Sequence, residues 1–124
     1  MWLNVTGGWT ALAPVLYPEP YVYVTVAQPP AALDAFAVIR EDEGVTLVLT
    51  RRQADDAGLR HDYLAARITL RIDSALAAVG LTAAVSGVLA GAGISCNVIA
   101  GSAHDHLFVD WDRAEEAMAL LGGL

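Results

Sequence analysis

The triplet His104-Asp105-His106 is the part of the sequence whose residue types most directly suggest chemistry. If it opens a strand, alternation places the two imidazoles on one face and Asp105 on the other. Two such histidines could supply two metal ligands, but a zinc site usually needs three or four, and His61 is the only other histidine. The triplet is therefore either a metal site at His104 and His106 or a polar entry to a strand, in which Asp105 bonds turn amides.

A catalytic role for the same triplet would require a nucleophile close to a histidine. None of the nearby serines lies in a nucleophile-elbow pattern: Ser74, Ser86, Ser95 and Ser102. The single cysteine, Cys96, has apolar neighbours and no visible cause for a lowered pKa, so it is expected to behave as a small hydrophobe. We therefore predict no catalytic residue and no cofactor.

A second candidate is the segment Asp73-Ser74-Ala75-Leu76-Ala77-Ala78-Val79-Gly80-Leu81, which joins an expected strand to an expected helix. The free amides and positive dipole end of a helix N-terminus can hold a carboxylate, and a glycine there lets a ligand approach the backbone. Asp73 could pair with the ammonium of the same ligand. In the structural alternative, Asp73 or Ser74 caps the helix and Gly80 packs against the sheet.

Charge and composition exclude several classes of protein. The net charge is −7, and the seven basic residues are scattered arginines, so neither nucleic acid nor an anionic membrane is an expected partner. Residues 74–103 carry no charge and could span a bilayer, but the break at Gly91-Ala92-Gly93 favours a helix followed by a strand. The absence of a leader pattern, together with one cysteine, predicts a cytoplasmic protein.

The positioning elements follow from hydrophobic periodicity and breakers. The expected strands are 21–26, 36–40, 45–49, 66–72, 94–100 and 106–109, and Glu41-Asp42-Glu43-Gly44 forms a turn. The expected helices are 10–16, 51–57, 81–92 and a last one that opens with a capping box at Asp112-x-x-Glu115. The helix at 81–92 is the best marked, since its apolar positions form one stripe and Gly93 is placed for a left-handed cap.

An internal repeat relates the two halves of the chain. When the sequence is shifted by 60 positions, Val38 falls on Val98, Leu47 on Leu107 and Ala54 on Ala114. No gap is needed across strand, turn, strand and helix, which predicts two related strand–strand–helix units.

Several longer motifs resemble a family of small bacterial ACT-domain proteins of uncharacterised function. They are Ile68-Thr69-Leu70, the segment 73–85 with Val79-Gly80-Leu81, the run Gly93-Ile94-Ser95-Cys96-Asn97-Val98-Ile99-Ala100-Gly101, His104-Asp105-His106-Leu107-Phe108-Val109, and Arg40-Glu41-x-Glu43-Gly44 in the first half. The chain departs from the family at Asp73-Ser74-Ala75, where a histidine and two serines are usual, and at Ser102-Ala103, where aromatic residues are usual. Both departures lie close to the expected ligand.

The resemblance implies an α+β fold of two ferredoxin-like, ACT-type βαββαβ halves, which share an antiparallel sheet with helices packed on one face. The halves are expected at 1–62 and 63–124. An ACT module usually regulates in response to an amino acid, and its ligand lies near the first strand-to-helix loop. Carried over, the ligand site comprises Asp73, Ser74, Val79, Gly80, Leu81, Asn97 and Ile99.

The expected function is non-catalytic binding of a small amino-acid-like ligand by a homodimer or larger oligomer. Asp73 would hold the ammonium, the amides around Gly80 and Leu81 the carboxylate, and the backbone near Asn97 would complete the site. One alternative is a ligand-free module that regulates a partner through sheet or helix pairing. Another is a metal-dependent enzyme built on His104 and His106.

Overall fold

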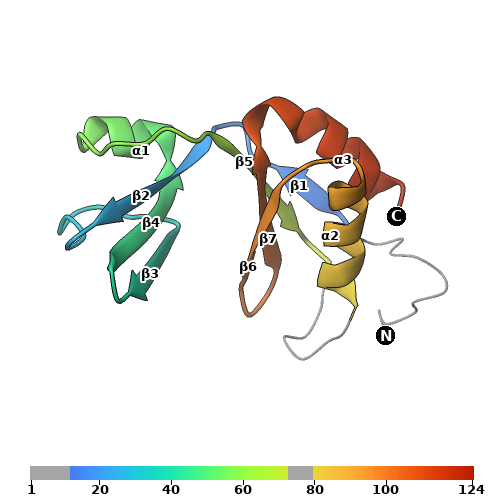
Figure 1. Cartoon of the computed structure of the whole chain (residues 1–124), viewed down its shortest axis with the longest axis horizontal. Helices are drawn as coiled ribbons and strands as arrows, with labels where there is room; N and C mark the ends of the chain where they lie inside the picture. Colours follow the sequence, from blue (N-terminus) through green and yellow to red (C-terminus); the bar gives the residue numbers. More distant parts are fainter. Residues whose placement is uncertain (1–11, 73–79) are drawn as a thin grey trace. The chain divides into compact units, whose positions relative to one another are not determined.

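The computed structural model describes residues 12–72 and 80–124, which form two compact units (Figure 1). Unit 1 combines the described residues of Met1–Tyr17 and Ala66–Leu124, and unit 2 is Pro18–Ala65. The strands are β1 (Pro14–Leu16), β2 (Tyr21–Val26), β3 (Ala37–Glu41), β4 (Gly44–Thr50), β5 (Ala65–Leu70), β6 (Cys96–Ala100) and β7 (Asp105–Asp110). The helices are α1 (Arg51–Asp56), α2 (Leu81–Gly91) and α3 (Ala114–Gly122), the last preceded by the 3-10 turn η1 (Trp111–Arg113).

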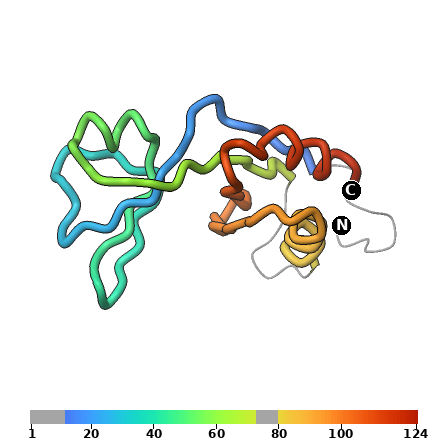
Figure 2. Tube along the Cα trace, turned by 45° about the horizontal axis from the view of Figure 1, so that its top comes forward, coloured from blue at the N-terminus to red at the C-terminus, as the bar shows by residue number. Residues whose placement is uncertain are grey.

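The sheet of unit 1 has the strand order β1-β5-β7-β6. Strand β1 pairs antiparallel with β5, with Val15 opposite Thr69, and strand β6 pairs antiparallel with β7. The short blue strand β1 also contacts the red helix α3, so the beginning and the end of the described chain lie together (Figure 2). This arrangement is why residues before Pro18 belong to unit 1 although 48 residues of unit 2 follow them.

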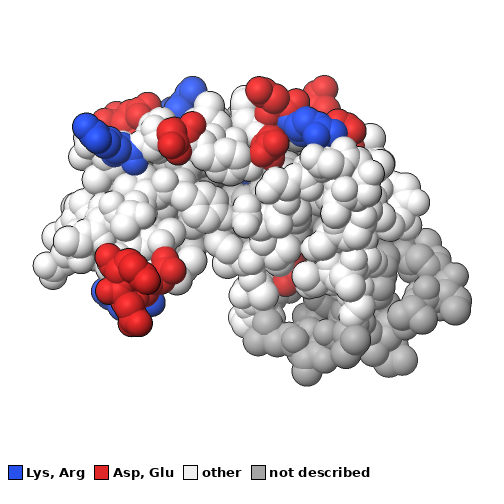
Figure 3. Space-filling view, viewed as in Figure 1, with Lys and Arg blue, Asp and Glu red and all other residues white. Residues whose placement is uncertain are grey.

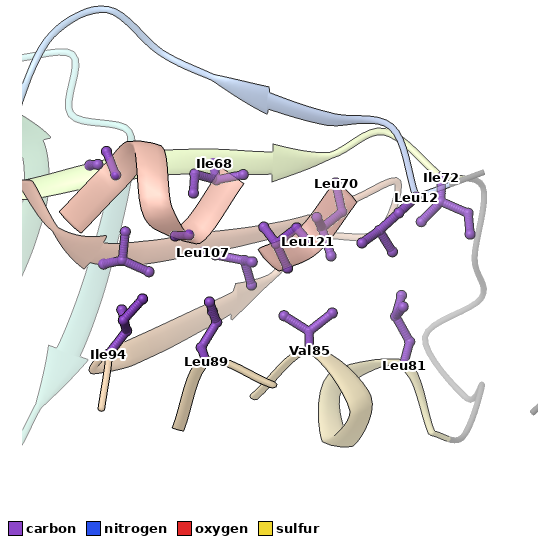
Figure 4. Packing of buried hydrophobic residues seen from close by; sticks show 14 residues of the cluster. Leu12, Ile68, Leu70, Ile72, Leu81, Val85, Leu89, Ile94, Leu107 and Leu121 are labelled. Atoms are coloured by element: carbon purple, nitrogen blue, oxygen red, sulfur yellow. The ribbon is translucent and has the colours of Figure 1, made fainter. Parts of the chain in front are cut away.

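Helices α2 and α3 cover one face of this sheet and form the larger core. Along α2, Leu81, Val85 and Leu89 are 3%, 0% and 0% exposed, and Figure 4 shows them pointing at the strands. Their spacing of four residues produces the apolar stripe that the sequence predicts. Burial of each such side chain contributes about 1.5–3 kcal/mol. Gly93 follows α2 with φ 73°, which confirms the predicted left-handed glycine after the helix.

Alternation along β5 separates the two faces of the sheet of unit 1. Ala66, Ile68 and Leu70 are buried in the helix-covered core. Arg67 and Thr69 therefore lie on the opposite face. The pairing continues past the strand, since the Arg71 amide donates to the Ala13 carbonyl at 3.0 Å.

Unit 2 has the strand order β3-β4-β2-β5, in which Tyr21 pairs with Ala65, the first residue of β5. Strands β2 and β4 bury Val22, Leu47 and Leu49 against Ala54 of α1, in a smaller core. Residues 27–36 form turns and bends, so this unit has no helix between its first two strands. The predicted acidic turn closes the β3–β4 hairpin, and its exposed carboxylates form the red group at the hairpin tip in Figure 3.

The predicted repeat is confirmed at the level of hairpin register. Val38 pairs with Leu47 in unit 2, and Val98 pairs with Leu107 in unit 1, with the same offset. In each unit the hairpin is followed by a helix that packs on the same sheet. The fold class is therefore the predicted one, a mixed α+β protein of two ferredoxin-like units.

Two local predictions are wrong. Residues Pro14–Leu16 form strand β1 and not part of a helix, because β5 offers them a hydrogen-bonding edge and Pro14 lacks an amide donor. The predicted capping box at Asp112 and Glu115 is absent, since Asp112 lies within η1 and α3 has no side-chain cap. The capping box in the described chain is instead at Thr50 and Gln53, before α1. Among the described residues, no helix has the length and apolarity needed to cross a membrane.

Candidate functional site

The predicted ligand loop is described only at its C-terminal end. Asp73, Ser74 and Val79 lie outside the described residues, whereas Gly80 and Leu81 begin α2. Gly80 occupies the N-cap position with φ 102°, in the left-handed region that glycine adopts without strain. The Gly80 carbonyl accepts the first helical hydrogen bond, from the Ala84 amide at 2.9 Å.

The N-terminus of α2 has the electrostatic character that an anionic group requires. The first amides of a helix have no acceptor within it, and here these belong to Leu81, Thr82 and Ala83. No described side chain caps them, and the first turn contains no acidic residue. The positive end of the helix dipole is therefore not offset by a carboxylate of the helix itself.

The remaining predicted site residues divide between two faces. The Leu81 side chain is 3% exposed and packs in the core, so only its backbone can serve a ligand. On β6, Cys96 and Val98 pack against the core, which places Asn97 and Ile99 on the face opposite α2. Asn97 is exposed and Ile99 is half-buried. The structure thus brings the α2 amides and the β6 side chains into one unit but not onto one face.

The His104-Asp105-His106 triplet begins a strand, as expected if it is a polar entry to a strand. Strand β7 starts at Asp105, which pairs with Ala100, and the Gly101 amide donates to the His104 carbonyl at 2.9 Å. His106 lies on the face opposite the helices, where its Nδ1 is 2.8 Å from the Thr69 Oγ1. Burial raises the pKa of the Asp105 carboxyl.

Basic side chains on and just after β5, and just before β7, act on His106. Burial lowers the pKa of its imidazole, and the charges of Arg67, His104 and Arg71 lower it further. Sequence reasoning did not identify this link between β5 and β7. The available signal was the alternation in Arg67-Ile68-Thr69-Leu70-Arg71, which places the three polar side chains on one face.

The described residues contain no cluster of metal-ligating side chains. Across 12–72 and 80–124, no three His, Cys, Asp or Glu side chains lie close enough to hold a metal ion. Burial raises the pKa of the Cys96 thiol to about 11, so the thiol stays protonated at neutral pH. The expectation that Cys96 acts as a small hydrophobe fits its packing against the core of unit 1.

Comparisons with known proteins identify the family. ACT domain family models match residues 10–66 and 66–122. A Vibrio cholerae protein of unknown function, VC0802, described as a possible transport protein, is 45% identical over 91% of this chain and 88% of its own, with a TM-score of 0.85. Agrobacterium tumefaciens Atu0741 is 20% identical over 85% and 82%, with a TM-score of 0.71.

The regulatory subunit of aspartate kinase from Thermus thermophilus shares the fold, with a TM-score of 0.65 at 9% identity over 90% of this chain and 95% of its own. No curated protein sequence matches the chain significantly. Two consecutive ACT matches that cover nearly the whole chain agree with the two units and the repeated register. The chain belongs to the ACT-domain family, as a small tandem ACT protein, and this membership supports a regulatory, amino-acid-sensing role in general.

Proposed function

We propose that the chain is a non-catalytic ACT-type regulatory protein that binds a small amino-acid-like ligand at the loop 73–81. The Leu81, Thr82 and Ala83 amides hold the ligand carboxylate, and Asp73 holds its ammonium. ACT domains are typically regulatory, which supports a sensor in preference to an enzyme. Ser74 and Val79 remain part of this proposal, whereas Asn97 and Ile99 enter it only through their backbone, because their side chains lie on the face opposite α2.

The observation that supports the proposal most is that no side chain among the described residues caps the start of α2. Gly80 turns the chain into the helix without placing a side chain over the first amides, and no carboxylate lies in the first turn. Natural helices commonly satisfy these donors with Ser, Thr, Asp or Asn at the N-cap. A ligand carboxylate would supply the same hydrogen bonds and the same interaction with the dipole.

A thermal-shift titration with the twenty amino acids tests this proposal. A ligand at one hundred times its dissociation constant adds about 2.7 kcal/mol to the free energy of unfolding, which raises Tm measurably. Asp73→Asn should reduce the shift caused by the best amino acid, because it removes the partner of the ammonium. The same variant should leave the response to a matched carboxylate without an amine unchanged.

The Thr82→Asp variant should have opposite effects on the stability of α2 and on ligand binding. Thr82 is exposed, so the change should raise the stability of the ligand-free protein by about 0.3–1 kcal/mol, through the helix dipole. It should also weaken binding of the amino acid, since the carboxylate introduced at position 82 then competes with the ligand carboxylate for the same amides. Thr82→Asn is the neutral control of equal size. A ligand-induced shift that is equal in all three proteins would contradict the assigned carboxylate position.

A second candidate, an interaction module that works through sheet pairing, has its own supporting observation. Strand β3 ends the strand order of unit 2, and Val38 and Ile39 on it are 47% and 41% exposed. An exposed apolar edge strand is a template for pairing with another chain. This edge also supports the proposed homodimer or larger oligomer.

Light scattering on the Ile39→Lys variant tests whether β3 is an interface between copies of the chain. A charge at the centre of β3 should convert an oligomer into a monomer, because lysine on an edge strand disfavours strand pairing. Arg52→Gln, on exposed α1 surface, serves as the control. An unchanged mass in Ile39→Lys would exclude β3 as the interface, while a monomeric wild-type protein would exclude the oligomer itself.

A further inference from the structure

We propose that strand β3 binds an extended, basic segment of another protein, which adds antiparallel to the outer edge of the sheet of unit 2. The partner strand carries β-branched residues opposite Val38 and Ile39. Towards its N-terminal end it carries lysine or arginine beside the acidic turn Glu41-Asp42-Glu43. This inference rests on the second candidate function, the interaction module, and names the chemistry of its partner.

The hydrogen-bond pattern of the sheet determines which backbone groups of β3 point outward. The Arg51 amide donates to the Pro20 carbonyl at 2.9 Å, which marks a hydrogen-bonded pair at the end of the β2–β4 ladder. Such pairs alternate along an antiparallel ladder. The backbone groups of Thr46 and Val48 therefore face β3 and not β2.

The same alternation continues into β3. Ile39 and Ala37 lie opposite Thr46 and Val48, so the backbone groups of Ile39 and Ala37 bond to β4. The N–H and C=O groups of Val38 and of residue 40 consequently point away from β4. Because β3 ends the strand order, no strand of the described chain pairs with this edge.

The side chains along this edge are apolar and exposed. Val38 and Ile39 are 47% and 41% exposed, and alternation places them on opposite faces of β3. At the equivalent positions of β6, Val98 packs against the core of unit 1 and Ile99 is half-buried. Natural sheets commonly protect an edge with lysine, proline or a covering element, and β3 contains neither lysine nor proline. The edge of unit 2 is therefore a template for another strand.

The turn that follows β3 adds a strong negative charge beside this edge. Glu41, Asp42 and Glu43 are exposed and form the red group at the hairpin tip in Figure 3. Within 12–72 and 80–124, none of the three carboxylates forms an ion pair with an arginine or a histidine. The Thr46 hydroxyl donates to the Glu41 carboxylate, which holds Glu41 on the face that also carries Ile39. Cations of a partner would complement this turn.

Antiparallel pairing determines the pattern of the partner strand. Its residues opposite Glu41 and Ile39 share one face, so a cation followed two positions later by a β-branched residue matches both. Because β3 runs towards the turn, the cations belong at the N-terminal end of the partner. A second copy matches less well, since pairing Ile39 with Ile39 puts Arg40 opposite Val38 and no cation opposite the turn. Each copy also has a net charge of −7.

The test is amide hydrogen exchange of the full chain, followed by NMR, with a synthetic peptide as the probe. The peptide has blocked ends, two lysines at its N-terminal end and alternating valine and threonine after them. It should slow exchange of the Val38 and Arg40 amides saturably, while the Ile39 amide, which already bonds to β4, changes little. A peptide of the same composition with both lysines at the C-terminal end should bind about threefold or more weakly, because its cations lie far from the turn.

Arg40→Pro tests the backbone contact. It removes an N–H that points outward, and proline is tolerated at such a position of an edge strand. It should weaken the lysine peptide about fivefold or more, as expected for loss of one hydrogen bond. Arg40→Ala keeps the N–H and should bind at least as tightly as the wild-type protein. Equal weakening by both substitutions would contradict strand pairing.

A pair of matched double variants tests the charge of the turn. Asp42→Asn with Glu43→Gln should weaken the lysine peptide about threefold or more. Asp112→Asn with Glu115→Gln removes the same charge from exposed positions of unit 1 and should have a much smaller effect, because salt screens distant charges. The proposal is wrong if the two double variants behave alike.

The remaining outcomes separate this proposal from the others. If the Val38 and Arg40 amides are already protected without peptide and light scattering shows an oligomer, a second copy occupies the edge and the basic partner is excluded. If millimolar lysine peptide leaves their exchange unchanged, β3 does not bind such a strand. The Leu81, Thr82 and Ala83 amides report the amino-acid site separately, so neither failure affects it.

Discussion

Gly80 is the residue on which the amino-acid proposal most depends. Its φ of 102° is strained for any residue with a Cβ, and it stands where helices usually carry a capping side chain. Gly80 therefore turns the chain into α2 without a side chain of its own over the first amides. On the face of the sheet opposite the helices, the 2.8 Å contact between Thr69 Oγ1 and His106 Nδ1 joins β5 to β7.

The raised pKa of Cys96 gives a prediction about its reactivity. At pH 8 the folded protein should react with iodoacetamide about a hundredfold more slowly than the urea-unfolded chain, because a pKa near 11 rather than 9.0 reduces the thiolate fraction by that factor. Since the raised pKa favours the neutral thiol in the folded state, stability should fall as the pH rises from 9 to 11. Equal rates in folded and unfolded protein would contradict the burial.

Residue-level predictions succeeded where the cause is local. Gly93 lies directly after an apolar stripe, and the role of a glycine at that position depends only on its own helix. The contact between Thr69 and His106 joins residues 37 positions apart, so no local pattern could predict it. The burial of the His104 Nδ1, which has no hydrogen-bond partner within 12–72 and 80–124, likewise depends on tertiary packing.

At the scale of elements, α1 depends on its cap. With six residues, it is too short to be stable from helix propensity alone. Thr50 accepts a hydrogen bond from the Gln53 amide at 3.1 Å, and the Gln53 side chain accepts one from the Thr50 amide at 3.0 Å. The Gln53 side-chain amide also donates to the Asp34 carbonyl at 2.8 Å, which ties the 27–36 connection to the helix.

Thr50→Ala should lower the free energy of unfolding by about 1 kcal/mol, since the Gln53 amide loses the hydroxyl oxygen that accepts its hydrogen bond. Urea unfolding followed by circular dichroism measures this loss. Thr50→Ser keeps the hydroxyl and should retain most of the stability. If Thr50→Ser lowers the free energy of unfolding as much as Thr50→Ala, the hydrogen bonds of the cap do not stabilise α1.

Elements with strong periodicity were predictable, and those defined by a partner were not. Alternation in Tyr21–Val26 and the stripe from Leu81 to Gly91 gave β2 and α2 nearly to their ends. Strand β1 has three residues and exists because β5 provides its hydrogen bonds. The capping box was assigned to Asp112 although Thr50-x-x-Gln53 fits the Thr-x-x-Gln pattern more closely.

At the scale of the molecule, the chain is a tandem repeat in which each unit has the strand order expected of a ferredoxin-like sheet. The repeated hairpin register shows that the relation between the units extends to individual strand pairs. The division at 1–62 and 63–124 stays a prediction. Sequence patterns cannot assign residues 12–17 to a unit, because their placement with Ala66–Leu124 depends on long-range contacts.

The central claim is that the start of α2 receives the carboxylate of an amino-acid-like ligand. The most direct measurement is an amide NMR titration with each of the twenty amino acids, with the Leu81, Thr82 and Ala83 resonances as the readout. The account predicts that at least one amino acid shifts these three amides saturably, and that Thr82→Asp suppresses the response. If no amino acid moves them at millimolar concentration, or if all shifts map elsewhere, the proposed receptor site is wrong and the family and fold assignments alone remain.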